Sequence, residues 1–139
     1  MEAVVSLSKD ARTTAGVILL TIVAVEYGGT FMLRVVRGRV PATEFQKAFF
    51  RAGHAHAGVL VILALVGQIL ADGAGMHGVP SSLARSGIPL AAILMPAGFF
   101  FSSAGRGVSK PNGFVVLLYA GAASLAIGVV ALGVGLLTS

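Results

Sequence analysis

Four apolar stretches, each about 20 residues or longer, fill most of this chain of 139 residues. A helix rises about 1.5 Å per residue, so each stretch is long enough to cross a hydrocarbon layer about 30 Å thick. Hydrophobic residues make up 56% of the chain and charged residues only 11%, well below the charged share of water-soluble domains. The sequence therefore predicts an integral membrane protein and leaves no room for a soluble catalytic, nucleotide-binding or nucleic-acid-binding domain.

The predicted fold is all-α: an integral membrane four-helix bundle with short loops, forming one domain. Pro41 ends the first span, a glycine-rich loop with Pro80 precedes the third, and a polar turn at 105–112 precedes the fourth. In the third span, Pro96 predicts a kink or an opened backbone group beside a cavity, and the phenylalanines at 99–101 either line an aromatic pocket or contact lipid. The spans are expected at residues 13–36, 47–71, 83–104 and 113–137.

Basic residues gather at two of the three connections between spans and indicate the orientation of the chain. Seven of the ten lie in or beside the first and third connections: Arg34, Arg37, Arg39, Lys47, Arg51, Arg106 and Lys110. Short cytoplasmic connections carry an excess of Lys and Arg, so we expect the chain in the cytoplasmic (inner) membrane with both termini outside the cytoplasm. Anionic lipid head groups account for the net charge of +5, and no nucleic-acid partner is expected.

The fourth span carries small residues at a regular spacing. Gly121, Gly128 and Gly135 recur every seven residues, with Ser124 and Ala131 between them on the same face. Helices in a membrane associate through close packing of small residues, because burying one apolar side chain against another gains little in lipid. We interpret this seam as packing inside the bundle, with a contact between subunits as the alternative.

Two histidines in the second span are the most informative polar residues, and the chain has no cysteine that might serve as a metal ligand. An ionisable group at membrane depth is costly unless it has a partner, so such groups are functional candidates. His54 and His56 point about 200° apart on a helix, so they cannot chelate one ion together and predict two separate roles. The small residues around them, within 52–58, suit a large flat ligand such as a porphyrin, and suit close helix packing equally well.

Glu26 in the first span is expected at the same depth as these histidines if the first two spans form an antiparallel hairpin. A carboxylate bonded to His54 or His56 would stabilise both groups and orient the ring. A protonated Glu26 bonded to a backbone carbonyl is the alternative.

Taken together, the second and third spans resemble a family of small four-helix membrane isomerases that includes styrene oxide isomerase and, more distantly, hydroxylaminobenzene mutase. In that family the second span opens with an Arg-Ala-His-Ser-Gly type motif whose histidine binds haem iron. The segment 55–58 (AHAG) is similar, with Arg51 and Ala52 ahead of it. The segment 98–101 (GFFF), a connection containing Pro-Asn and a Gly/Ala-rich fourth span are also similar.

The resemblance implies a homotrimer that binds haem b near its subunit interfaces and isomerises a small apolar epoxide or related substrate, with ferric iron acting as a Lewis acid. It implies His56 as the iron ligand, with His54 as a supporting group or the alternative ligand. Arg51 is available to pair with a haem propionate, and Gly58 and Phe100 complete the expected cofactor-binding residues.

The chain departs from that family at two positions. The family has an asparagine six residues after the histidine, where this chain has Ile62, and a tyrosine in the third span, where this chain has Phe100. Both missing groups hydrogen-bond substrate in the family, so isomerisation is expected to be weak, altered or absent. The alternatives are a haem or metal-binding membrane protein for electron transfer, sensing or carriage, and an accessory subunit of a larger membrane complex.

Overall fold

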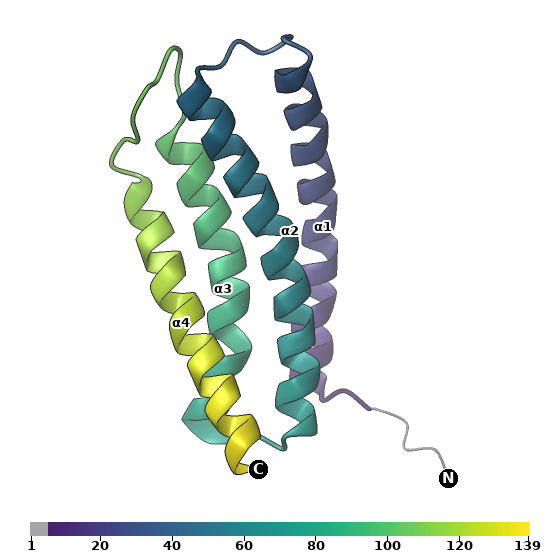
Figure 1. Ribbon diagram of the computed structural model, residues 1–139. Coiled ribbons are helices and arrows are strands. Elements are labelled where there is room, and N and C mark those ends of the chain that lie inside the picture. The colour runs from purple at the N-terminus through teal and green to yellow at the C-terminus, as the bar shows by residue number, and fades with distance from the viewer. Residues whose placement is uncertain (1–5) are drawn as a thin grey trace.

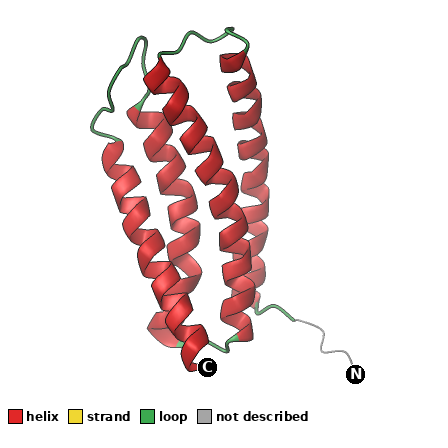
Figure 2. Ribbon diagram, in the orientation of Figure 1, coloured by secondary structure: helices red, strands yellow, loops and turns green. Residues whose placement is uncertain are grey.

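The computed structural model describes residues 6–139, and this part of the chain folds into four helices and no strand (Figure 2). The helices run alternately up and down, so α1 begins and α4 ends at the same end of the bundle (Figure 1). The prediction of an all-α four-helix bundle is confirmed. The helices are α1 (Lys9–Val36), α2 (Glu44–Gly73), α3 (Gly78–Ser102) and α4 (Val115–Thr138).

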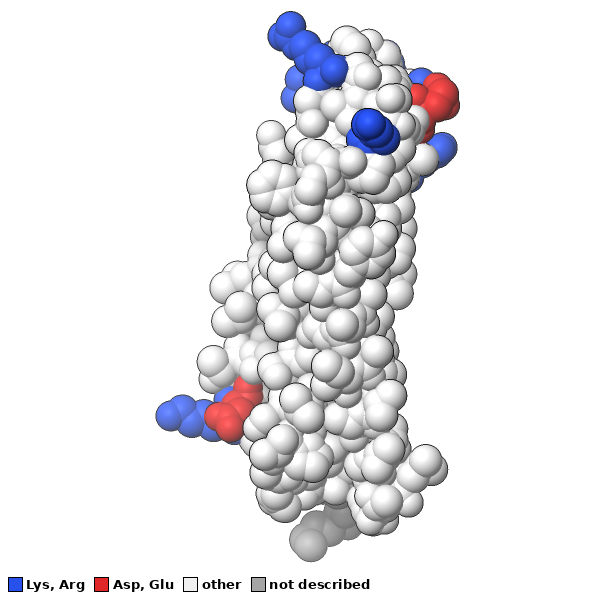
Figure 3. All heavy atoms as spheres, turned by 90° about the vertical axis from the view of Figure 1, so that its left-hand side faces the viewer, with Lys and Arg blue, Asp and Glu red and all other residues white. Residues whose placement is uncertain are grey.

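All four helices are long and apolar enough to span a membrane. They contain 24 to 30 residues, which corresponds to roughly 36 to 45 Å at 1.5 Å per residue. On the face shown in Figure 3, Lys, Arg, Asp and Glu gather near the two ends and leave the middle uncharged. The protein is therefore an integral membrane protein.

Local sequence explains why α2 and α3 begin earlier than predicted. The Thr43 hydroxyl accepts from the Gln46 amide, and the Gln46 side chain accepts from the Thr43 amide, both at 3.1 Å. This reciprocal cap starts α2 at Glu44 instead of residue 47. α3 starts at Gly78 instead of residue 83 because Pro80 lies in its first turn, where no helical donor is needed.

The glycine seam of α4 packs against α3 within the same chain. A Cβ added to Gly128 would lie 2.9 Å from the amide nitrogen of Ile88, so only glycine allows the two backbones this close. Ser124 Oγ also donates to the carbonyl of Gly87 at 2.8 Å. The interpretation of the seam as packing inside the bundle is therefore confirmed.

Substitution of Gly128 by alanine is expected to lower the free energy of unfolding by roughly 1–3 kcal/mol, because the added methyl group meets backbone atoms that cannot move aside. Gly133→Ala is the matched control in the same helix, since nothing lies within 4 Å of a Cβ there. Unfolding by SDS in mixed micelles measures both variants. Equal stability of the two would contradict the close contact.

Gln68 of α2 compensates for a proline in α3. Pro89 has no amide hydrogen, so the carbonyl of Arg85, four residues earlier, lacks its helical donor. The buried Gln68 side chain donates to that carbonyl from Nε2 at 2.8 Å. The interrupted backbone of α3 thus becomes a point of attachment for α2.

α1 lies at the side of the bundle and packs mainly against α2 (Figure 1). At the end where α1 begins, Asp72 accepts from the Ser8 amide at 2.7 Å and from the Ser8 hydroxyl at 2.9 Å. The same carboxylate pairs with Arg85 of α3, and the Asp72 and Arg85 side chains are only 12% and 17% exposed. These three residues, the Asp72 clamp, join α1, α2 and α3.

Candidate functional site

The two histidines of α2 point to different sides of the helix, as their spacing predicts. Cβ atoms added to Gly28 and Gly29 of α1 would lie 3.3 Å from His54 Nδ1 and 3.7 Å from His54 Nε2. His56 lies on the side of α3, with its ring centroid 5.0 Å from that of Phe99. Among residues 6–139, no three His, Asp or Glu side chains are grouped so that they could hold a metal ion. A site with three protein ligands of the zinc type is therefore not present in this part of the chain.

The ring of His56 is oriented by its own helix. Its Nδ1 lies 2.7 Å from the carbonyl oxygen of Ala52, one turn earlier. A carbonyl can only accept, so we infer that Nδ1 carries a proton; whenever the ring has a single proton, Nε2 keeps a free lone pair. This is the arrangement by which proteins commonly orient an imidazole that binds a metal through Nε2.

Each histidine of α2 has a phenylalanine of α3 on its own side of the helix. Phe99 packs beside His56, whereas Phe100 lines a groove on the other side of α2. Gly53 makes room for both, because a Cβ there would lie 2.9 Å from the Phe100 ring and 3.0 Å from Phe99 Cβ. Phe101 is 54% exposed. The three phenylalanines were expected either to line a pocket or to contact lipid. Phe100 lines the groove, Phe99 packs against His56, and Phe101 lies on the outer surface of the bundle.

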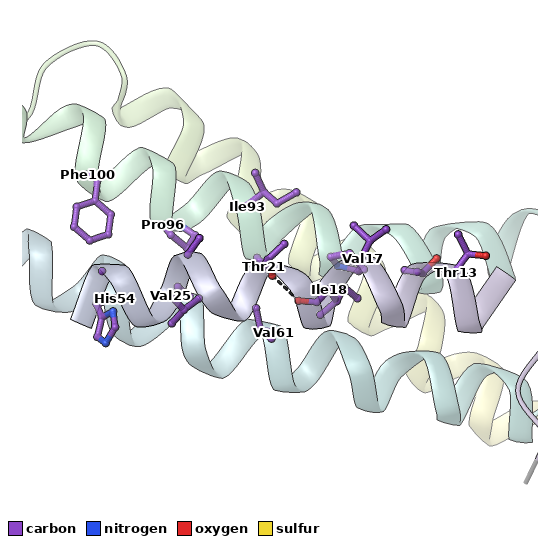
Figure 4. A pocket seen from close by; sticks show the side chains of 16 residues that line it. Thr13, Val17, Ile18, Thr21, Val25, His54, Val61, Ile93, Pro96 and Phe100 are labelled. Carbon is purple, nitrogen blue, oxygen red and sulfur yellow. Dashed lines mark hydrogen bonds between the residues drawn. The ribbon is translucent and has the colours of Figure 1, made fainter. Parts of the chain in front are cut away.

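An apolar groove of about 430 Å³ runs between α1 and α3, with α2 along its floor. Figure 4 shows His54 and Phe100 at one end and Thr13 at the other. α1 lines it from Thr13 to Gly28, roughly 22 Å at 1.5 Å per residue. Among the described residues that line it, only three threonines and His54 have polar side chains. The groove therefore places one imidazole at the end of a long apolar passage.

The expected cofactor-binding residues are divided between two sides of α2. Arg51 is exposed and lies about 140° around the helix from His56. Gly58 lies about 200° from His56, and nothing is within 4 Å of a Cβ placed on it. His54 and Phe100 line the groove. Within one chain, therefore, none of these four residues shares the His56 side, and their binding of a cofactor stays a prediction.

Glu26 does not meet either histidine. It is exposed on the outer side of α1, and no hydrogen bond or ion pair joins it to another residue of the described chain. α1 turns Gly28 and Gly29 toward His54 instead, and these follow Glu26 by two and three residues on the helix. The helix rotation, which sequence alone does not fix, is the reason that the expected pairing is not formed.

The Asp72 clamp is not among the features predicted from the sequence. Asp72 directly follows the expected second span at 47–71, and Arg85 is one of the three basic residues outside the first and third connections. The signal was present, because the two residues have opposite charges and flank the same short loop. Their pairing, together with the Gln68 bond to the Arg85 carbonyl, joins α2 to α3 by polar contacts at this end of the bundle.

Two separate features thus lie on different sides of α2. One is the oriented imidazole of His56 beside Phe99, and the other is the apolar groove that ends at His54. Comparisons with protein-family models, with curated proteins and with solved structures find no match to this chain.

Proposed function

We propose that this chain is a haem-b-binding integral membrane protein in which His56 Nε2 would bind the iron. The observation that carries the proposal is the bond between Nδ1 and the Ala52 carbonyl, which leaves Nε2 as the nitrogen available to bind a metal. One protein ligand is enough, because a porphyrin supplies the equatorial ligands. His54 suits this role less well, since its ring lies against the α1 backbone at Gly28 and Gly29.

The surroundings of His56 fit a flat apolar cofactor. Phe99 offers an aromatic surface beside the imidazole, and Ala52 and Ala55 leave little side-chain bulk on the same helix. Val59, one turn further along α2, is 64% exposed and extends the apolar surface. These residues would hold the cofactor by packing and keep water from the iron.

A second copy of the chain would complete this site. His56 is half-exposed at an edge of the bundle, so one chain does not enclose a cofactor there. Glu26 gives independent support, because its exposed carboxyl lies near the middle of the α1 span, where facing lipid is costly. Contact with another copy removes that cost. The family resemblance implies a trimer.

The proposed activity is isomerisation of a small apolar epoxide, and it rests on the family resemblance. Haem iron would supply Lewis-acid polarisation of the epoxide oxygen. The residues of this chain hold and orient the cofactor through His56 and exclude water through Phe99. Ile62 and Phe100 carry no hydrogen-bonding group, and this observation favours a second candidate function, a non-enzymatic haem protein for electron transfer, sensing or carriage.

Protein purified in mild detergent from haem-replete cells is expected to show a Soret band, with about one haem per chain. Turnover of an aryl epoxide by that preparation would support the isomerase, and a stable haem spectrum without turnover would support the second candidate. A colourless, metal-free preparation would overturn haem binding altogether. That outcome would leave the role of an accessory subunit.

A further inference from the structure

We infer that the groove between α1 and α3 is a binding site for a long-chain alcohol: the hydrocarbon chain fills the groove and the hydroxyl group meets His54. This site goes beyond the haem site proposed at His56. The groove is lined by the His54 side of α2, whereas His56 faces Phe99. The two ligands would therefore bind independently.

The dimensions of the groove fit one hydrocarbon chain. A volume of about 430 Å³ spread over a length of roughly 22 Å describes an elongated groove and not a compact cavity. The lining is apolar over most of that length, so a hydrocarbon chain matches the groove in both shape and chemistry.

The polar groups of the groove indicate where the oxygen of the ligand lies. Thr13 Oγ1 and Thr21 Oγ1 donate to carbonyls of their own helix at 2.9 and 2.6 Å. The third threonine, Thr14, lies near the start of α1, close to the end of the span where water can satisfy its hydroxyl. His54 is half-buried in the apolar layer and forms no hydrogen bond with any residue between 6 and 139. An imidazole without a partner in such a place is costly. A ligand oxygen at this end would satisfy it.

A second group near this end favours a hydroxyl over an oxygen that only accepts. Pro96 has no amide hydrogen, so the Ala92 carbonyl lacks its helical donor, and both residues line the groove. A hydroxyl can accept from an imidazole N–H and donate to a carbonyl. An alcohol can therefore serve either group, whereas an oxygen that only accepts cannot serve the carbonyl.

An ordinary lipid does not meet these needs. Its acyl tail carries no polar atom at the end, and its head group stays at the membrane surface. His54 lies ten residues after the start of α2, roughly 15 Å along the helix. A lipid tail would fill the groove but leave the imidazole unpaired.

Photolabelling with a hexadecanol that carries a diazirine on its chain tests the site in the full-length protein, with the same diazirine on hexadecane as the probe without oxygen. The alcohol is expected to label α1 and α3 residues of the groove, and excess unlabelled hexadecanol should abolish the labelling. His54→Phe keeps a ring of similar shape but loses the hydrogen bond. It should weaken alcohol binding roughly tenfold, to the level of the alkane, which is the effect of one hydrogen bond in an apolar site.

Two further variants distinguish labelling inside the groove from non-specific labelling on the lipid-facing surface. Ala57→Phe fills the groove and should remove labelling by both probes, whereas Val66→Phe, at an exposed position of the same helix outside the groove, should change neither. Equal, non-saturable labelling of the normal protein, V66F and H54F by both probes would overturn the inference, even if A57F fails to fold. The haem spectrum is recorded on the same samples, so failure of the haem proposal is seen separately.

Discussion

Replacing His56 with alanine is expected to abolish haem binding, so that H56A purifies with less than roughly a tenth of the haem found in the normal protein. The effect is large because the proposal gives the iron one protein ligand, and because the Ala52 carbonyl orients only that ring. Haem content per chain, from the Soret band and the pyridine haemochrome spectrum, measures it. Gel filtration of the same sample checks that the bundle has folded.

His54→Phe is the control, because it removes the neighbouring imidazole while His56 remains. It should retain the full Soret band, since His54 lies against Gly28 and Gly29 of α1. A cavity variant, His56→Gly, should regain haem when imidazole is added to the buffer. Loss of haem in H54F but not in H56A would assign the iron to the other histidine and contradict the proposal.

Features that depend on backbone periodicity alone could be predicted from the sequence. Four apolar runs gave four helices, and the seven-residue spacing of Gly121 and Gly128 gave a seam that packs against α3. The two-residue spacing of His54 and His56 placed them on different sides of α2. These results follow because every residue of a helix advances by the same angle and rise, whatever its surroundings.

Features that depend on how one helix is rotated against another could not be predicted. Glu26 was paired with a histidine on depth alone, but α1 turns Gly28 toward α2 and leaves the carboxyl outside. Gln68 is plainly polar in an apolar span, but its partner is the Arg85 carbonyl that Pro89 leaves without a donor, and this contact exists only when α2 and α3 are placed together. The groove could not be predicted for the same reason, because residues of three helices line it and their relative rotation decides which of them face it.

Asp72→Ala is expected to lower the free energy of unfolding by about 3 kcal/mol, the largest stability effect of any single substitution considered for this chain. The change leaves the guanidinium of Arg85 largely buried without its carboxylate, and it also removes the acceptor of both Ser8 hydrogen bonds. α1 should loosen first, because it packs mainly against α2 and is held at this end by the clamp. SDS unfolding in mixed micelles measures the free energy, and hydrogen exchange locates the loosening.

Glu44→Ala is the matched control, since it breaks an ion pair with Lys47 whose side chains are 88% and 41% exposed. An exposed pair contributes less than about 1 kcal/mol, so E44A should unfold almost like the normal protein. The double variant Asp72→Ala with Arg85→Met should recover part of the loss, because no charge is then left without a partner. If D72A and E44A lose the same stability, the carboxylate contributes only surface charge. If the double variant recovers nothing, the Ser8 bonds to α1 account for the effect.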